Sequence, residues 1–232
     1  MGRPVNQYKA LVFDLDGTLY YQKKLRIKMA WMIGSYYLCH FWRIKELFII
    51  KKFREVREDW DKEDKYKSYK TISGSGAEKG LEERQYLCVA DLMGTVPERV
   101  KNLVETWIYE KPLKLIYITR DRELISFIKE RRKKGQKIIV FSDYPIEDKL
   151  KVLELGVDGM YASTDDRIKE LKPSPKGLFL IMEDHKLDSS DILMIGDRMS
   201  RDGEAAINAN CDYIILPGTK RKRMLIYNEW RK

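Results

Sequence analysis

The stretch ALVFDLDGTL occupies residues 10–19 and joins a short apolar run to a group of acidic and small residues. The apolar part, residues 10–13, shows no alternation of polar and apolar side chains, which favours a strand buried on both faces. Asp14 and Asp16 follow directly, with Gly17 beside them. The stretch therefore predicts a buried strand that delivers two carboxylates to the edge of a sheet.

Similar apolar runs recur later in the chain, at residues 138–141, 192–195 and 213–216. Helical patterns separate them, at residues 121–134, 146–155, 174–185 and 202–210. The first of these has apolar residues at helical spacing and Gly135 as a stop signal. Strands alternating with helices predict an α/β fold, a Rossmann-like doubly wound parallel sheet.

Residues 20–112 interrupt this alternation after the first strand. Residues 25–60 are charged and aromatic, with apolar positions recurring every three or four, which predicts two or more helices. Residues 71–80 (TISGSGAEKG) have the composition of a loop. Residues 81–109 predict further helix, broken near Gly94 and Pro97. We therefore expect a core domain of residues 1–19 and 113–232, and an inserted, mostly helical domain of residues 20–112.

Composition excludes several classes of protein. The 232 residues are 44% hydrophobic, enough to bury a core, so a disordered chain is excluded. The three cysteines, Cys39, Cys88 and Cys211, stand far apart, which argues against a disulfide framework or a cysteine-rich zinc site. Residues 1–13 do not resemble a signal peptide. A reducing compartment and a cytoplasmic location are the expectation.

The chain carries a formal charge of +9, which raises the alternative of a nucleic-acid-binding protein. Part of the excess lies in a basic C-terminal tail, residues 220–232, which we interpret as a solvated terminus. No zinc-finger spacing or RNA-binding aromatic motif accompanies it. No nucleic-acid partner is expected.

A second alternative concerns the aromatic stretch of residues 29–42, which basic residues flank. It is too short and too diluted by polar residues to predict a transmembrane span. It could lie on a membrane surface as a basic aromatic helix, giving a peripheral membrane protein. The interpretation we favour is a packed helix of the inserted domain.

Polar side chains follow the predicted strands at their carboxyl ends, where open α/β sheets bind ligands. Asp14 and Asp16 follow the first strand, Ser142 the second, and Asp197 the third. Lys172 precedes a predicted helix in the sequence LKPSP. Clustered carboxylates repel one another, and Mg²⁺ bound through oxygen is one remedy, with Asp14 and Asp197 as possible ligands.

The same edge can bind phosphate. Ser142, Lys172 and the backbone N–H groups around Asp16 and Gly17 offer hydrogen-bond donors. One carboxylate can then attack phosphorus, while a second acts as acid and then as base. Leu15, between Asp14 and Asp16, would place both carboxylates on one side of an extended segment. Gly17 would permit a backbone turn there.

These stretches resemble the four motifs of the haloacid dehalogenase-like hydrolase superfamily, and they occur in its order. The motifs are DLDGTL at residues 14–19, Ser142 at the end of IIVFS, Lys172 in KPSP, and GDRMSRD at residues 196–202. The inserted domain matches no motif, but its position is that of the cap domain in capped members of the family.

The resemblance implies a role for each matching residue. Asp14 would be the nucleophile and a Mg²⁺ ligand, and Asp16 the general acid and base that also offers its backbone carbonyl to the metal. Thr18 and Ser142 would bind phosphate oxygens, and Lys172 would neutralise the nucleophile and the phosphate. The last motif would supply two carboxylates: Asp197 as a metal ligand, and Asp202 acting on the metal indirectly or through water.

The resemblance further implies a Mg²⁺-dependent phosphatase that hydrolyses a small phosphorylated metabolite through an aspartyl-phosphate. Dehalogenating members resemble DxYGT, so Asp16 favours phosphoryl transfer. A phosphomutase of the same superfamily remains an alternative. The sequence departs from phosphoglycolate phosphatases and β-phosphoglucomutases, which usually read DGTLxD, because Tyr20 and Tyr21 follow Leu19 here.

Overall fold

The computed structural model describes residues 3–60, 64–70 and 80–231. The chain divides into two compact units, an α/β unit of residues 1–26 and 115–232 and an inserted unit of residues 27–114. The loop predicted at residues 71–80 lies, except for its last residue, outside the described part. No helix within the described ranges is both long and apolar enough to cross a bilayer.

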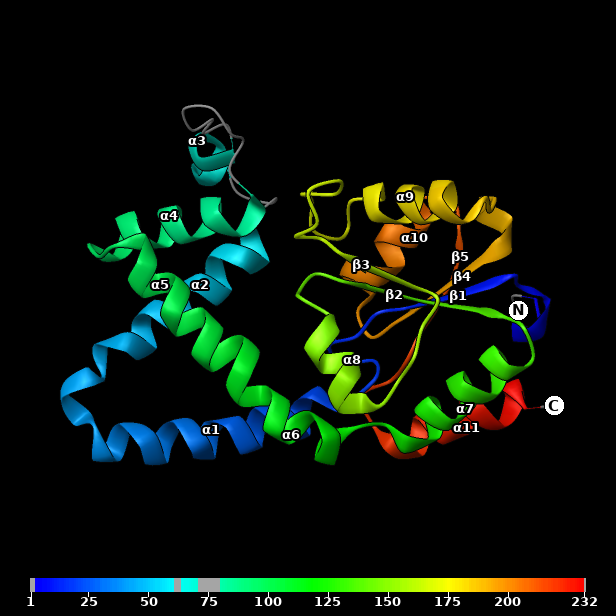
Figure 1. Ribbon diagram of the computed structural model, residues 1–232, viewed down its shortest axis with the longest axis horizontal. Coiled ribbons are helices and arrows are strands. Elements are labelled where there is room, and N and C mark those ends of the chain that lie inside the picture. Colours follow the sequence, from blue (N-terminus) through cyan, green and yellow to red (C-terminus); the bar gives the residue numbers. More distant parts are fainter. Residues whose placement is uncertain (1–2, 61–63, 71–79, 232) are drawn as a thin grey trace. The chain divides into compact units, whose positions relative to one another are not determined.

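The α/β unit is built on a five-stranded sheet with strand order β3-β2-β1-β4-β5 (Figure 1). Every neighbouring pair is parallel. The strands are β1 (Ala10–Phe13), β2 (Lys137–Ser142), β3 (Gly159–Ala162), β4 (Ile192–Gly196) and β5 (Asp212–Ile215). This confirms the predicted parallel sheet. The sequence analysis missed β3, because GMYA is too short and too mixed to stand out as an apolar run.

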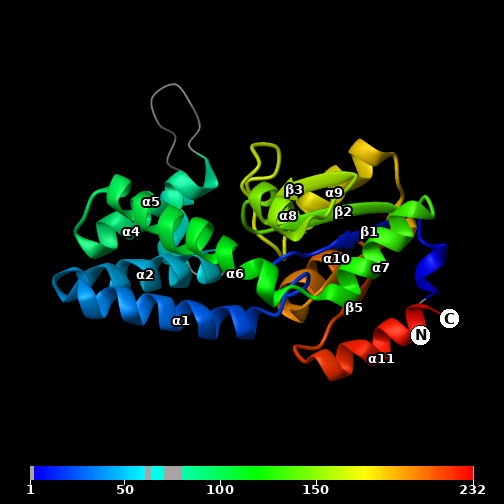
Figure 2. The same cartoon turned by 60° about the horizontal axis from the view of Figure 1, so that its bottom comes forward.

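Helices cover both faces of this sheet, as a doubly wound fold requires (Figures 1 and 2). On one face, α9 and α10 contribute Leu178, Ile181 and Ala205 to a buried cluster with Val12 and Ile139 of the central strands. On the other, α11 packs beside α7, and α7 contacts β2. The helices are α7 (Arg122–Lys133), α8 (Glu147–Leu153), α9 (Lys176–His185), α10 (Glu204–Asn208) and α11 (Lys220–Trp230). Short helical turns are η1 (Val5–Gln7), η5 (Ser189–Asp191) and η6 (Met199–Gly203).

The inserted unit is helical. Its helices are α1 (Gln22–Cys39), α2 (Lys45–Asp59), α3 (Lys67–Lys70), α4 (Leu81–Met93), α5 (Pro97–Val104) and α6 (Lys111–Thr119). The shorter turns are η2 (Phe41–Arg43), η3 (Asp64–Tyr66) and η4 (Glu105–Glu110). The chain passes between the two units within α1 and α6. The predicted interruption falls at Gly94, which ends α4 in the left-handed conformation, and at Pro97, which begins α5.

The core of the inserted unit lies among α2, α4 and α5, which pack against one another. Phe53 of α2 is fully buried and its ring lies 5.6 Å from that of Tyr86 on α4. Arg57 of α2 is also buried, and its guanidinium donates a 2.8 Å hydrogen bond to the side-chain oxygen of Gln85. The unit therefore has an apolar core of its own, with polar contacts of Arg57 inside it.

Candidate active site

Asp14 lies at the carboxyl end of β1, where the ladder between β1 and β4 continues for one more hydrogen bond. The Asp14 N–H donates to the Ile195 carbonyl at 2.8 Å. The side chain is 6% exposed. One carboxylate oxygen accepts a 2.7 Å bond from Lys172 Nζ, and the other accepts a 3.0 Å bond from Thr18 Oγ1. The central strand thus holds Asp14 between a cation and a hydroxyl.

The chain turns shortly after Asp14, at the place where Gly17 predicts a turn. Residues 16–19 form a turn, closed by the Leu19 N–H donating to the Leu15 carbonyl at 3.1 Å. Gly17 has a φ of 108°, a conformation that side-chain-bearing residues rarely adopt. A Cβ at Gly17 would lie 2.2 Å from a carboxylate oxygen of Asp197. Glycine is required here both by the turn and by the close approach of Asp197.

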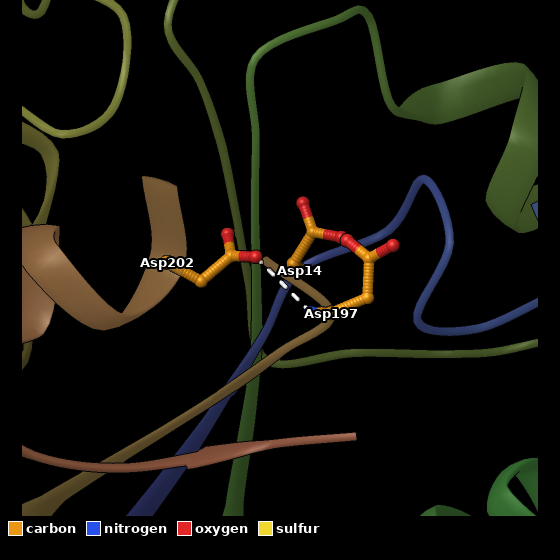
Figure 3. Close-up of side chains that lie close together, drawn as sticks. All are labelled: Asp14, Asp197 and Asp202. Atoms are coloured by element: carbon orange, nitrogen blue, oxygen red, sulfur yellow. Dashed lines mark hydrogen bonds between the residues drawn. The ribbon is translucent and has the colours of Figure 1, made fainter. Parts of the chain in front are cut away.

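Asp14, Asp197 and Asp202 come together beyond the ends of β1 and β4 (Figure 3). One carboxylate oxygen from each lies within 4.8 Å of the others. Asp202 is 1% exposed, and its Oδ2 accepts hydrogen bonds from the N–H groups of Asp197 and Arg198 at 3.1 and 3.0 Å. A Cβ at Gly196 would lie 2.3 Å from the Asp202 side chain, so this glycine makes room for it.

The three carboxylates differ in how they are paired. Asp202 Oδ1 accepts a 2.6 Å bond from Lys172 Nζ, so both Asp202 oxygens are engaged. Among the described residues, no side chain or backbone group donates a hydrogen bond to the Asp197 carboxylate. Burial, followed by repulsion from Asp202, raises the pKa of Asp197 to about 6. Its oxygens are the ones left available to a ligand.

Lys172 is the central cation of the site. It is 1% exposed and stands on the loop before α9. The backbone N–H of Lys172 donates to Asp143 Oδ1 at 3.0 Å, and its backbone carbonyl accepts a hydrogen bond from the Arg201 side chain. Burial opposes its charge, but the attraction of Asp14 and Asp202 prevails and raises the pKa of Lys172 above its usual value. The raised pKa favours the charged, protonated form of Lys172.

For Asp14, the candidate nucleophile, burial prevails over the attraction of its partner. Burial raises the pKa of Asp14 well above its ordinary value. Lys172 opposes this shift, and the neighbouring carboxylates of Asp202, Asp197 and Asp16 add to it. Bringing so many carboxylates together is costly unless cations compensate. The possible ligands are all oxygen atoms, and the carboxylates outnumber the ammonium groups around them. This arrangement fits a hard divalent cation such as Mg²⁺.

Asp16 points to a separate set of partners. Both of its oxygens accept hydrogen bonds from Lys149 Nζ, at 2.6 and 2.8 Å. Oδ2 also accepts a 3.2 Å bond from Ser142 Oγ, and Tyr20 donates through its hydroxyl. Although burial opposes it, the Lys149 charge with these hydrogen bonds lowers the pKa of Asp16. The lowered pKa favours the ionised carboxylate, the form that accepts a proton.

Sequence reasoning gave no role to four residues of this region. Lys149 and Tyr20 bind Asp16, and Asp143 orients the Lys172 backbone. Arg223, on α11, is 1% exposed. It donates to the carbonyls of Gly17 and Thr18 and, at 3.1 Å, to the buried carboxylate of Asp121.

The position of Arg223 corrects the interpretation of the basic tail as solvated throughout, because one of its arginines holds the turn after Asp14. Of the four, only Tyr20 adjoins a departure visible in the sequence, because Tyr21 stands where phosphoglycolate phosphatases and β-phosphoglucomutases usually have an acid. Lys149, seven residues after Ser142, and Arg223, 21 residues after Asp202, lie outside the motifs, and no local signal marks them.

Comparison with known proteins decides the family. The family model of haloacid dehalogenase-like hydrolases matches residues 8–210. The chain belongs to this family. The haloacid dehalogenase-like hydrolase is therefore an enzyme, and the resemblance carried by its four motifs is confirmed. No curated protein matches the sequence.

Solved structures share the fold of this hydrolase at low identity. A 2-haloacid dehalogenase from Pseudomonas syringae pv. Tomato DC3000 has a TM-score of 0.59 and 16% identity, over 90% of this chain and 86% of its own. The HAD-hydrolase YfnB from Bacillus subtilis, bound to magnesium, has a TM-score of 0.57 and 13% identity, over 97% and 100%. CbbY from Rhodobacter sphaeroides, in complex with xylulose-(1,5)bisphosphate, has a TM-score of 0.53 and 17% identity, over 92% of this chain and 89% of its own. At these identities the likeness concerns the fold alone.

Proposed function

We propose that this hydrolase is a Mg²⁺-dependent phosphatase that acts on a small phosphomonoester. The observation that carries the proposal is the pair of carboxylates at the end of β1. Asp14 is held by Lys172 and Thr18, and Asp16, two residues on, is held by a different cation, Lys149. Two carboxylates that are close in sequence but bound by separate cations suit two separate roles.

Asp14 would act as the nucleophile. Its carboxylate oxygen attacks phosphorus, a P–O bond forms, and the bond from phosphorus to the leaving oxygen breaks. Lys172 remains bound to Asp14 and limits the charge that accumulates as the aspartyl-phosphate forms. Ser142 and Thr18, whose hydroxyls now donate to Asp16 and Asp14, are placed to donate to phosphate oxygens instead.

Asp16 would move protons in both half-reactions. Its carboxyl group gives a proton to the leaving oxygen in the first step. In the second step its carboxylate takes a proton from the water that attacks the aspartyl-phosphate, and inorganic phosphate and free Asp14 result. The contact with Lys149 favours the second, ionised form, so we expect Asp16 to be the more effective as a base.

The residues present fit a divalent cation. The Asp14 and Asp197 carboxylates and the Asp16 backbone carbonyl would hold it, while Asp202, whose oxygens already bind Lys172 and two N–H groups, would orient this arrangement. When bound, Mg²⁺ would neutralise negative charge on the carboxylates and on the phosphate.

We also propose that the inserted unit selects the substrate as a cap domain does. The α/β unit by itself supplies the nucleophile, the acid and base, and the phosphate donors. The inserted unit contributes none of them, although it has its own core. Discrimination among substrates depends on contacts made in the transition state beyond the reacting group. Replacing residues 27–114 by a Gly/Ser linker should keep partial activity on an aryl phosphate and remove the ranking among metabolites. An unchanged ranking in a folded, active variant would leave the inserted unit without this role.

A screen of phosphorylated metabolites, with inorganic phosphate as the readout, tests the activity itself. Each substrate is assayed with Mg²⁺ and with a chelator, and 2-haloacids are assayed in parallel for released halide. Phosphate release that requires the metal is the expected result. Halide release without phosphate release would replace the proposal by dehalogenation. An isomerised sugar phosphate without free phosphate would indicate a mutase.

A further inference from the structure

The inserted unit carries an apolar surface that its own core leaves uncovered. Seven large apolar side chains between residues 27 and 48 are exposed: Ile27, Trp31, Leu38, Phe41, Trp42, Ile44 and Phe48. We call these seven residues the α1–α2 surface. Trp31 is 79% exposed and Leu38 80%. Single exposed apolar residues are ordinary on a protein surface, but a concentration of this kind marks an interaction site.

Helix α1 is apolar on two opposite sides. Met29 and Tyr37 are buried on one side. Ile27, Trp31 and Leu38 are spaced by four and seven residues, which places them together on the opposite side. A surface helix ordinarily keeps its solvent-facing side polar. Figure 2 shows α1 running along one edge of the inserted unit. The second apolar side therefore has no counterpart within the described core of this unit.

The charges around this surface are positive. Residues 27–52 contain five basic residues and one acidic residue. Lys28, Arg43, Lys45 and Lys51 are exposed. The acidic residue, Glu46, is 4% exposed and already bound, with Arg43 Nε at 2.9 Å. The surface thus combines exposed aromatic and aliphatic side chains with a cationic rim whose one carboxylate is neutralised.

We propose that the α1–α2 surface binds an anionic lipid bilayer without crossing it. Tryptophan settles at the boundary between headgroups and hydrocarbon, and lysine and arginine are attracted to anionic headgroups. Aliphatic side chains such as Leu38 and Ile44 bury apolar area when they enter the edge of the hydrocarbon layer. Nucleic acid offers them no such layer, because it binds proteins through phosphate charge and through stacking of bases on aromatic rings. Bound in this way, α1 would lie along the membrane with its other side still packed in the protein.

The test is co-sedimentation of the full chain with vesicles. One set contains phosphatidylcholine with about a third phosphatidylglycerol, and the other phosphatidylcholine alone. Retention on the anionic vesicles at low salt is expected, several-fold weaker on the neutral ones, and weaker again at high salt because the attraction is screened. Tryptophan emission should shift to shorter wavelength with the anionic vesicles. Absence of retention at low salt would overturn the proposal.

Two sets of variants locate the contact. W31A/L38A/F41A should weaken retention by about tenfold or more, and K28E/K45E should weaken it on anionic vesicles only. The matched controls are F179A/L225A and K129E/K133E, which change exposed residues of the α/β unit and should bind as the unaltered chain does. Circular dichroism checks each fold, and the lysine pair supplies the test should the triple variant unfold.

Equal retention of the surface variants and the controls would overturn the assignment. So would a concentration-dependent dimer, detected by analytical ultracentrifugation, that the triple variant abolishes. In that case a second copy of the chain would be the occupant of the surface.

Discussion

The α/β unit buries a cluster of charges at one edge of its sheet, whereas one segment of the inserted unit exposes a cluster of apolar side chains. Beyond the ends of β1 and β4, Asp14, Lys172 and Asp202 are almost fully buried, and each is paired with another of the three. In the inserted unit, the segment from Ile27 to Phe48 leaves aromatic and aliphatic side chains in contact with solvent. Both arrangements are costly, and neither improves stability. The difference agrees with the proposed roles, chemistry in the α/β unit and recognition in the inserted unit.

The strongest test of this division removes the nucleophile. Asp14→Asn should lower turnover by about 10³-fold or more, since an amide neither attacks phosphorus nor binds a cation well. Chelation of the metal should have a comparable effect that added Mg²⁺ reverses. The measurement is released phosphate, with thermal unfolding as the control for folding. Turnover that persists in the variant would place the chemistry elsewhere.

A sharper test separates the two carboxylates of the α/β unit. Asp16→Asn should slow esters with poor leaving groups by about 10²–10⁴-fold, because general acid and base help is worth this much. An aryl phosphate with a good leaving group needs less protonation and should lose less. The comparison uses kcat/KM on both kinds of substrate. Equal losses would mean that Asp16 only anchors Lys149 and Ser142.

Arg223 tests whether the buried charges outside the motifs serve the site. Arg223→Met removes the cation beside the buried Asp121 carboxylate, which keeps hydrogen bonds from the Tyr227 hydroxyl and the Leu124 N–H. It also frees the carbonyls of Gly17 and Thr18. The free energy of unfolding should fall by about 3–5 kcal/mol, and kcat should fall as the turn after Asp14 loosens. Arg221→Met, an exposed arginine of the same helix, is the matched control. A stable variant with unchanged kcat would remove α11 from the support of the site.

In the inserted unit, a core substitution should act locally. Phe53→Ala deletes a fully buried ring that lies against Tyr86, at a cost of about 3–5 kcal/mol. Hydrogen exchange should accelerate in α2, α4 and α5 but not in the strands of the α/β unit. Phe48→Ala, five residues earlier and exposed, should leave exchange unaltered. Equal acceleration in the strands would show that the two units unfold together.

The smallest expected effect concerns the exposed surface itself. Trp31→Ala, without lipid, should change the free energy of unfolding by less than about 0.5 kcal/mol, because a side chain that is 79% exposed contributes little packing. Hydrolysis of a soluble aryl phosphate should be unaffected. A marked loss of stability would mean that Trp31 is structural, which would weaken the contrast between the units.

Local patterns in the sequence were enough to predict the parallel sheet, the inserted helices and the group of polar residues at one sheet edge. Short apolar runs mark buried strands, and parallel strands end at the same edge, so Asp14, Ser142 and Asp197 could be expected near one another. Gly17 predicted a turn, because glycine adopts backbone conformations that other residues rarely adopt.

Only the tertiary structure decided which charges pair with which. Lys149 lies 133 residues from Asp16, and Arg223 lies 206 residues from Gly17. Nothing in the local sequence distinguishes Arg223 from Arg221, yet helix packing buries one and leaves the other in water. The exposure of Trp31 was equally undetermined, since apolar positions on both sides of α1 could have faced a core. Pairing and burial depend on which surfaces meet, and that is set by the packing of distant segments rather than by spacing along the chain.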